Sequence, residues 1–428
     1  TDQTILEIKE TLNQANKYFI NRKLLQTYSL YKKLYKKFGI QELIPEMVNV
    51  TFVSNKQNLL KNRNLKFKLI DGILNYGLKR VQKKDVIFKL VSLKLKLYRD
   101  FKEFEKFEKS YNELDQGLKD NLFIRYEYIE YLLEQEIYDI AEKELKYLKE
   151  KSKSLDSNPY FRGISNFILD KEKCSEIYKS ATNFDEIINH EIIEEKINSS
   201  FSLIVIVTGN FNIFENEIVK FLETVELMTN NYLFVVLIND ATDDQKETII
   251  SKIESMKIAN YRIEFENTNK FNFNDLEKKM FYTTRRFLLT EQLMKKFNVP
   301  IFVTDADTIV LKDLNDFVKD NKNADMSLTF KVANRNFKTF VSATHALFLP
   351  TKCSKIFLDF YKKYVYFLIK NKRNLVWFTD QIALNTTYIY LKRFYEPTFS
   401  TNAYNNHKNL NSYFYHTLHN NTLMKLEN

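Results

Sequence analysis

The sequence predicts a chain of two parts: an all-α domain of helical-hairpin repeats at residues 1–198 and an α/β domain with a mostly parallel sheet at residues 199–428. Three observations favour this division. A length of 428 residues exceeds the usual size of one compact core. Up to about residue 198, apolar side chains recur at intervals of three and four, which is the helical period. From residue 201 onward, short apolar runs alternate with helical segments, which is typical of α/β domains.

The composition is that of an ordinary globular protein. Hydrophobic residues make up 44% and charged residues 28% of the chain, which excludes a disordered or collagen-like class. The two cysteines, Cys174 and Cys353, lack CxxC spacing, so the sequence indicates neither a disulfide framework nor a zinc site. No apolar run approaches the roughly 20 residues that span a bilayer, and no charged-then-apolar leader is present. We therefore expect a cytoplasmic protein, either free or peripheral at the inner face of the membrane.

The helical part shows apolar stripes and a basic excess. One stripe comprises Phe101, Phe104, Phe107 and Tyr111. A similar segment follows about 36 residues later, an interval typical of helix-hairpin repeats, and this part resembles tetratricopeptide repeats. The basic excess behind the net charge of +10 lies mainly in residues 1–100. That charge favours an acidic partner, namely an anionic glycan, a phospholipid surface or, least of all, nucleic acid; a solvated lysine-rich helical face is the alternative.

The α/β part begins with residues 201–207, a continuous apolar run that predicts a buried parallel strand followed by a polar turn. Further along, periodicity predicts helices at 215–229, 243–256 and 275–298 and strands at 232–238, 261–266 and 301–304, of which 261–266 is expected at a sheet edge. This alternation predicts βαβ units. No glycine follows Gly209, which excludes a glycine-rich phosphate loop from the C-terminal half.

Polar residues follow three of the predicted strands, where open α/β sheets bind their ligands. The last of these strands ends in Asp305-Ala306-Asp307, the only DxD pattern in the chain. Two carboxylates one residue apart on an extended chain point the same way, and such hard oxygen donors suit Mn²⁺ or Mg²⁺ rather than zinc. The sequence therefore predicts a divalent metal at Asp305 and Asp307. A helix-capping or solvent-facing acidic turn is the alternative.

With its surroundings, this pattern resembles family 8 and related bacterial glycosyltransferases of the GT-A fold. The resemblance covers residues 201–428 and rests on the segments FYTTRRF (281–287) and PIFVTDAD (300–307). It implies a Rossmann-like domain in which the two aspartates hold a metal that bridges the diphosphate of the donor. Either Arg285 or Arg286 is expected to contact the phosphates or the donor sugar, because a guanidinium fork matches phosphate oxygens, and the other to form a surface ion pair.

The same resemblance implies two site residues downstream. In WFTDQIAL (377–384), Asp380 is expected to orient the acceptor or to remove its proton, with a helix N-cap as the alternative. In VSATHALFL (341–349), His345 is expected either to contact hydroxyls of the donor or acceptor or to be a buried core histidine.

The C-terminal segment implies the third metal ligand. Family 8 enzymes supply a histidine from an HxxGxxK pattern, and this chain has His416, His419 and then Lys425, with no glycine and altered spacing. We expect His416 as the ligand ahead of His419, with two surface histidines as the alternative.

The early strands resemble the nucleotide-binding strands of GT-A enzymes. Thr208 and Asn210 would flank the base, and Asp240 would accept hydrogen bonds from the base or ribose.

These residues and the resemblance predict a metal-dependent glycosyltransferase. It would move a sugar from a nucleotide sugar, expected to be a UDP-sugar, to an acceptor hydroxyl on a surface glycan, a glycolipid or a protein that the helical domain recruits, as in polysaccharide biosynthesis. One alternative is a helical-repeat scaffold with an inactive transferase domain. Another is a nucleotidyl- or phosphotransferase, which the lack of a phosphate loop disfavours.

Overall fold

The computed structural model describes residues 2–21, 23–53, 63–151, 161, 163–180, 190–330, 340–371, 378–395, 399–403 and 413–416. The chain divides into two compact units, Thr1–Ser152 and Lys153–Asn428. None of the described helices combines the length and the apolar character needed to cross a bilayer.

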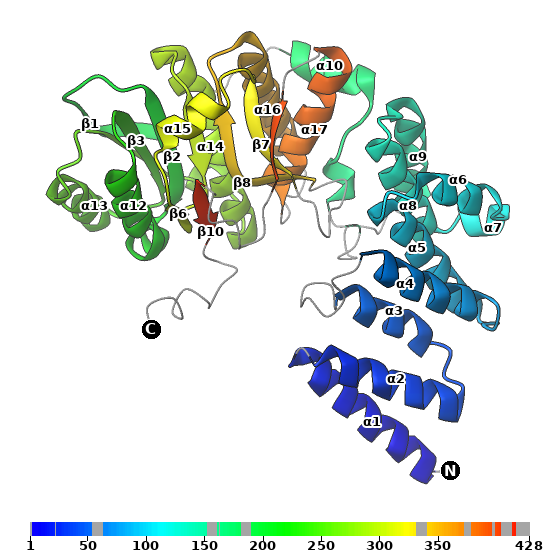
Figure 1. Ribbon diagram of the computed structural model, residues 1–428. Helices are drawn as coiled ribbons and strands as arrows, with labels where there is room; N and C mark the ends of the chain where they lie inside the picture. Colours follow the sequence, from blue (N-terminus) through cyan, green and yellow to red (C-terminus); the bar gives the residue numbers. More distant parts are fainter. Residues whose placement is uncertain are drawn as a thin grey trace. The chain divides into compact units, whose positions relative to one another are not determined.

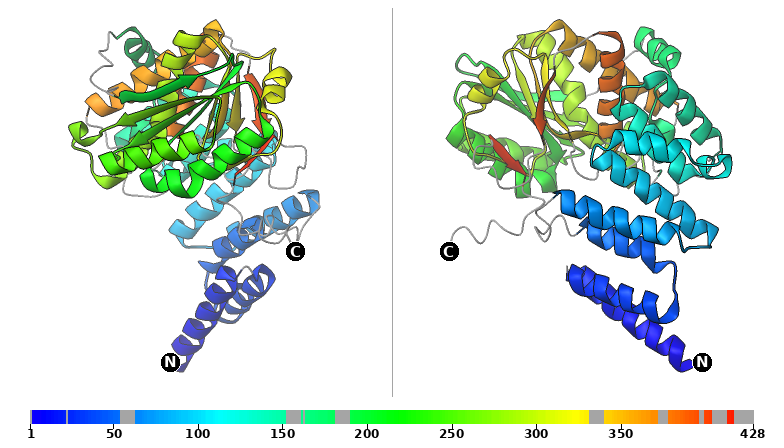
Figure 2. Two further views of the ribbon diagram at one scale, coloured as in Figure 1. Left: turned by 90° about the vertical axis from the view of Figure 1, so that its left-hand side faces the viewer. Right: turned by 45° about the vertical axis from the view of Figure 1, so that its right-hand side comes forward.

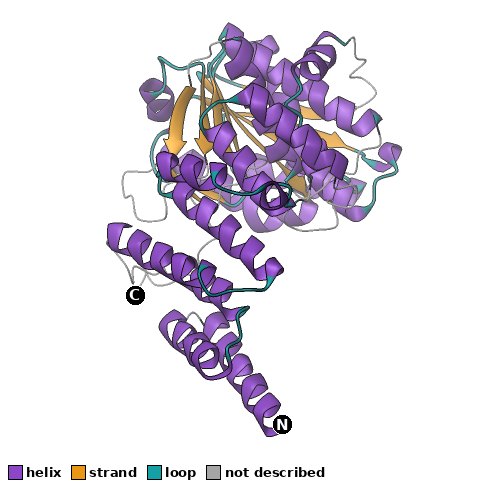
Figure 3. Cartoon of the chain, turned by 90° about the vertical axis from the view of Figure 1, so that its right-hand side faces the viewer, coloured by secondary structure: helices purple, strands orange, loops and turns teal. Residues whose placement is uncertain are grey.

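The first unit is helical throughout its described residues, as the period of its apolar side chains predicts (Figure 3). Its helices are α1 (Asp2–Ile20), α2 (Leu24–Phe38), α3 (Leu43–Val53), α4 (Arg63–Leu78), α5 (Lys84–Asp100), α6 (Phe104–Asn112), α7 (Gln116–Lys119), α8 (Leu122–Glu134) and α9 (Tyr138–Lys151). From α1 to α6 each helix packs on the next in the chain, and α5 also packs on α8. The all-α character is thus confirmed for the first unit, whereas residues 190–197 of the predicted all-α part form a strand, β1. The assignment to tetratricopeptide-like repeats stays a prediction.

The second unit is built around an eight-stranded sheet of order β1-β4-β3-β2-β5-β8-β7-β9 (Figure 1). The strands are β1 (His190–Ile197), β2 (Leu203–Asn210), β3 (Tyr232–Asn239), β4 (Asn260–Glu266), β5 (Ile301–Thr304), β7 (Met326–Phe330), β8 (Val341–Phe348) and β9 (Phe399–Ala403). The central strands β4, β3, β2 and β5 are parallel, β1 and β8 flank them antiparallel, and β7 runs parallel to β9. A separate antiparallel pair joins β6 (Thr308–Val310) to β10 (Phe414–His416). The predicted mostly parallel α/β sheet is confirmed.

Helices cover both faces of this sheet (Figure 2). Alternate residues of a strand point to opposite faces, so the buried strands present apolar side chains on both sides. Ile204 and Ile206 face one core, formed with α10 (Lys171–Lys179), α14 (Asp275–Phe297), α16 (Lys352–Lys370) and α17 (Thr379–Phe394). Val205 and Val207 face the other, formed with α12 (Val219–Met228), α13 (Asp243–Ser255) and α15 (Leu314–Asp320). Short helical turns complete the unit at Ile164–Asn166 (η3), Phe211–Ile213 (α11), Phe214–Ile218 (η5) and Asn269–Phe271 (η6).

One strand of the second unit lies elsewhere than expected. The strand β4 is not at the sheet edge, because β1 pairs with it from His190 to Ile197. The charged sequence of β1, HEIIEEKI, lacks the apolar run by which the other strands were predicted. The compact units divide after Ser152, since α10 packs on α16 and β1 belongs to the sheet, while the domain boundary at residue 198 stays a prediction.

Candidate active site

The DxD segment forms the turn between β5 and β6, at the carboxyl end of the parallel strands. The Asp305 N–H donates to the Thr344 carbonyl of β8 at 2.9 Å. Across the turn, the hydroxyls of Thr304 and Thr308 lie 2.8 Å apart. The Asp305 side chain is 27% exposed and Asp307 is 9% exposed. Neither aspartate caps a helix, since the next helix, α15, is capped by Asp313. The turn is therefore fixed to the sheet with one carboxylate partly open to solvent.

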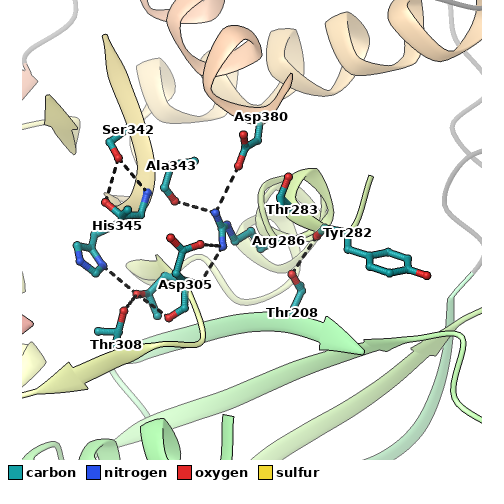
Figure 4. A network of polar contacts seen from close by, with 12 residues as sticks. Thr208, Tyr282, Thr283, Arg286, Asp305, Thr308, Ser342, Ala343, His345 and Asp380 are labelled. Atoms are coloured by element: carbon teal, nitrogen blue, oxygen red, sulfur yellow. Dashed lines mark hydrogen bonds and ion pairs between the residues drawn. The ribbon is translucent and has the colours of Figure 1, made fainter. Parts of the chain in front are cut away.

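Arg286 contacts two carboxyl groups of the site, those of Asp305 in the DxD turn and Asp380 on α17 (Figure 4). It lies on α14, is 4% exposed, and its Nη1 donates to Asp305 Oδ1. Its Nη2 donates to the Ala343 carbonyl at 2.9 Å and lies 3.6 Å from Asp380 Oδ2. One guanidinium thus balances two carboxylates, which fixes their separation and lowers their mutual repulsion.

Arg285, the neighbouring arginine, is in a different place from the site. Its side chain is fully buried, and its Nε donates to Oε2 of Glu266, a residue at the end of β4 that is also buried. The expectation that one of the two arginines forms a surface ion pair is wrong, because successive residues of α14 both point into the protein here. Arg286 is the arginine that reaches the DxD turn.

Asp380 enters the site from the first turn of α17. It is 6% exposed, and its Oδ1 accepts from the Gln381 N–H at 2.8 Å. The N-cap of α17 is Phe378, at φ 76°, so the N-cap interpretation of Asp380 is wrong. Burial raises the pKa of Asp380 above its ordinary value, Arg286 offsets part of that rise, and Asp305 adds to it. A buried carboxyl group whose pKa is raised is a candidate for proton exchange with a substrate.

His345 supports the DxD turn from β8. Its ring is 5% exposed and lies nearly parallel to the Phe302 ring, with 6.2 Å between centroids. Its Nδ1 lies 2.9 Å from the Thr304 hydroxyl. Of the two interpretations that the sequence left open, the buried core histidine fits this environment, and its polar contact is to the turn itself.

His416 is brought to the DxD turn by the β-ladder. In the β6–β10 pair its Cα partner is Thr308, the residue that follows Asp307. The backbone of His416 therefore lies beside the turn, although no local sequence pattern relates two positions so far apart in the chain. His419 and Lys425 fall outside the described residues.

The three residues expected around the nucleotide are bonded within the protein. The Thr208 hydroxyl donates to the Tyr282 carbonyl at 3.1 Å, and the Asn210 side chain caps α11 by accepting from the Ile213 N–H at 3.0 Å. Asp240 accepts from the Thr268 N–H at 2.7 Å and from the Tyr282 hydroxyl at 2.5 Å. Burial alone would raise the pKa of Asp240, but these hydrogen bonds hold it below its ordinary value.

A hollow of about 620 Å³ opens beside Asp240, at the carboxyl ends of β3 and β4. Its lining comprises Glu191, Asp240, Ala241, Thr242, Lys246, Phe265, Glu266, Asn267 and Asn269. Polar groups predominate in this lining, which suits a ligand with several hydrogen-bonding atoms.

The donor set of the turn fits a hard divalent cation. Asp305 and Asp307 offer carboxylate oxygens from one short turn, and oxygen ligands of this kind are those that Mn²⁺ and Mg²⁺ prefer. Within the described side chains, no three His, Cys, Asp or Glu groups gather into a metal cluster. A complete site therefore needs a further ligand. His416 is the candidate, because its backbone lies beside the DxD turn.

Solved glycosyltransferase structures are similar to part of this chain. Mouse xyloside xylosyltransferase 1 is 8% identical over 48% of this chain and 85% of its own, with a TM-score of 0.30. The galactosyltransferase LgtC, solved with donor and acceptor sugar analogues, is 14% identical over 43% of this chain and 69% of its own, with a TM-score of 0.34. The glycosyltransferase GlyE of Streptococcus pneumoniae TIGR4 is 12% identical over 48% and 45%, with a TM-score of 0.31. No protein-family model and no curated protein sequence matches the chain.

Sequence reasoning missed several residues that shape this site. Thr304 and Thr308 brace the turn, Thr283 lies beside Asp380, and Tyr282 bonds Asp240. The available signal was the helical period, because residues three and four apart lie on one face of a helix and Tyr282 and Thr283 precede Arg286 on α14 by four and three residues.

Proposed function

We propose that this chain is a metal-dependent glycosyltransferase that moves a sugar from a UDP-sugar to an acceptor hydroxyl. The observation that carries the proposal is the DxD turn at the carboxyl end of the parallel strands, with Arg286 bonded to Asp305 and within 3.6 Å of Asp380. Carboxylates for a cation, a buried arginine and a carboxyl group of raised pKa are the groups that transfer from a nucleotide diphosphate requires.

In this proposal Asp305, Asp307 and His416 hold Mn²⁺ or Mg²⁺. When bound, the cation would supply positive charge against the diphosphate that leaves the sugar. Arg286 orients Asp305 through its hydrogen bond and, before the donor binds, forms an ion pair with Asp380. Asp380 accepts the proton of the acceptor hydroxyl or orients that hydroxyl. The hollow beside Asp240 is the place that we assign to the base and ribose of the donor.

The acceptor is proposed to be anionic and to bind the helical unit at a basic face on α2 and α4. The rings of Tyr35 and Tyr76 meet at 6.3 Å between centroids and join these two helices. The exposed apolar members of the face are Leu25 (66%), Leu65 (55%), Leu69 (43%) and Tyr76 (43%), and its exposed cations are Lys32, Lys36, Lys68, Lys79 and Arg80. The sequence of α2 contains no acidic residue. Such a face suits a surface glycan, a glycolipid or an acidic protein, and it is compatible with peripheral association at the cytoplasmic face of a membrane.

Hydrolysis of nucleotide sugars tests this function without knowledge of the acceptor. Wild type, Asp307→Ala and Asp316→Ala are incubated with UDP-glucose, UDP-galactose and UDP-N-acetylglucosamine, with and without Mn²⁺. The Asp316 control removes a carboxylate that is 56% exposed on α15. We expect Mn²⁺-dependent release of UDP by wild type and by the control, and its loss in Asp307→Ala. If wild type neither hydrolyses a nucleotide sugar nor binds one in a metal-dependent way, the scaffold hypothesis is favoured. If it consumes an NTP when no nucleotide sugar is present, a nucleotidyl- or phosphotransferase is favoured.

A further inference from the structure

Tyr361, in the middle of α16, carries a buried hydroxyl that nothing in the described fold uses. Its side chain is 0% exposed, and among the described residues its hydroxyl has no hydrogen-bond partner. Tyr364, three residues along the same helix and equally buried, donates its hydroxyl to the Asn166 carbonyl. Buried polar groups are nearly always bonded, so a hydroxyl without a partner calls for a functional explanation.

The surroundings of Tyr361 belong to the candidate active site. Its ring packs on Phe287 at 5.4 Å between centroids. The Arg286 guanidinium lies 5.3 Å from the centroid of the same Phe287 ring. The three helices α14, α16 and α17, which carry Arg286, Tyr361 and Asp380, pack on one another. Tyr361 thus stands one aromatic ring away from the arginine that holds Asp305.

The contact between Asp380 and Arg286 is long for a buried ion pair, although the Asp380 carboxyl group also accepts hydrogen bonds from the Gln381 N–H and from Thr283. Asp380 Oδ2 lies 3.6 Å from Arg286 Nη2, which makes an ion pair without hydrogen-bond geometry. The negative charge of Asp380 reaches the Tyr361 hydroxyl: burial raises the pKa of Tyr361 well above its ordinary value, and Asp380 adds to that rise. The hydroxyl therefore keeps its proton at any working pH and is available as a hydrogen-bond donor.

We propose that Tyr361 is a positioning residue whose hydroxyl donates a hydrogen bond to the Asp380 carboxylate when the UDP-sugar occupies the site. The inference rests on the proposed function. Donor binding would draw Arg286 toward the substrate and weaken its ion pair with Asp380, and the Tyr361 hydroxyl then fixes the carboxylate against the acceptor hydroxyl. Phenylalanine would fill the same space without burying an unbonded oxygen, so the hydroxyl serves a state other than the substrate-free one.

The experiment compares Tyr361→Phe with Tyr364→Phe in the full chain. Each variant loses one buried hydroxyl from α16, so the pair is matched in size and position. The measurements are the melting temperature, the affinity for UDP with Mn²⁺, and kcat and KM for hydrolysis of the UDP-sugar that wild type cleaves fastest. An Asp380→Asn background completes a double-mutant cycle.

For Tyr361→Phe we expect a melting temperature equal to that of wild type or higher by up to about 4 °C. UDP affinity and KM should be unchanged, while kcat falls by about tenfold to a hundredfold, the usual loss for a residue that orients another. For Tyr364→Phe we expect a lower melting temperature and an unchanged kcat. In the Asp380→Asn background, Tyr361→Phe should have no further effect on kcat.

Two results would overturn the inference while leaving the proposed function intact. One is a wild-type kcat for Tyr361→Phe. The other is an equal additional loss of kcat in the Asp380→Asn background, because Tyr361 would then not act through Asp380. A wild-type chain that neither binds UDP with Mn²⁺ nor cleaves any UDP-sugar would overturn the proposed function and this inference together.

Discussion

Removing one partner of the buried ion pair between Arg285 and Glu266 is predicted to destabilise the second unit strongly, and Glu266→Gln tests this. Both side chains are fully buried, and the Arg285 Nε donates to Glu266 Oε2. Removing one partner of such a pair costs about 3–5 kcal/mol, because the remaining buried charge loses its counter-charge. An arginine cannot neutralise itself by losing its proton, so Arg285 keeps its full charge in the variant. Glu264, a buried carboxyl group within the field of Arg285, offsets part of that charge, and we expect a loss of about 3 kcal/mol.

The assay is thermal unfolding of the full chain. A unit of this size shifts by roughly 2–4 °C for each kcal/mol, so its melting temperature should fall by about 6–12 °C in Glu266→Gln. The control is Lys319→Ala, which breaks an ion pair with Asp316 whose side chains are 73% and 56% exposed, and which should leave the melting temperature nearly unchanged. The double variant Glu266→Leu with Arg285→Met, which replaces the ion pair by apolar side chains, should recover most of the loss. An unchanged melting temperature for Glu266→Gln, or a double variant that loses as much as the two single variants together, would refute the reasoning.

Two further predictions concern the helical unit. Burial lowers the pKa of Lys66 to about 8 from 10.5, and its Nζ donates to the Phe52 carbonyl at 3.1 Å. Because the unfolded chain binds this proton more tightly than the folded one, the stability of the unit should rise as pH increases from about 8 to 10.5. Lys66→Met should abolish that rise and stabilise the unit at pH 7 by about 2 kcal/mol. Urea unfolding of wild type and variant, at pH 7 and at the two ends of this window, measures both effects. A wild type whose free energy of unfolding falls across the window contradicts the account. Charge reversal of Lys32, Lys36 and Lys68 to Glu should abolish binding to anionic polysaccharide at low salt, whereas Lys109→Glu on α6, outside the basic face, should not; equal binding by the two variants would exclude the face as the acceptor surface.

Much of the fold could be predicted from the sequence because the central strands are buried on both sides. The runs at β2, β3 and β5 are continuously apolar, and such runs have few other places in a folded protein. The strand β1 could not be found in this way, since its Glu194 and Glu195 side chains are not apolar and its pairing with β4 is a long-range event. For the same reason β4 was expected at the sheet edge.

The candidate site could be predicted only in part. The DxD turn follows a recognisable strand, so Asp305 and Asp307 stood out from local pattern. The partner of each arginine could not be predicted, because it depends on how α14 is rotated about its axis: Arg286 faces Asp305, and Arg285 faces Glu266. Asp240 likewise looked available to a ligand, but its bonds to Thr268 and Tyr282 join segments that are distant in the chain.

The most direct test of the account is the melting temperature of the full chain with UDP, in the presence and absence of Mn²⁺, for wild type and Asp307→Asn. A ligand that binds only the folded state adds about 2.7 kcal/mol of stability at a hundredfold excess over its Kd, which corresponds to about 5–10 °C for a unit of this size. The account predicts a rise of that order for wild type only when UDP and Mn²⁺ are present together, and none for Asp307→Asn. A rise that is independent of Mn²⁺, or that persists in Asp307→Asn, would contradict the central claim that the DxD turn holds a metal for the diphosphate of the donor.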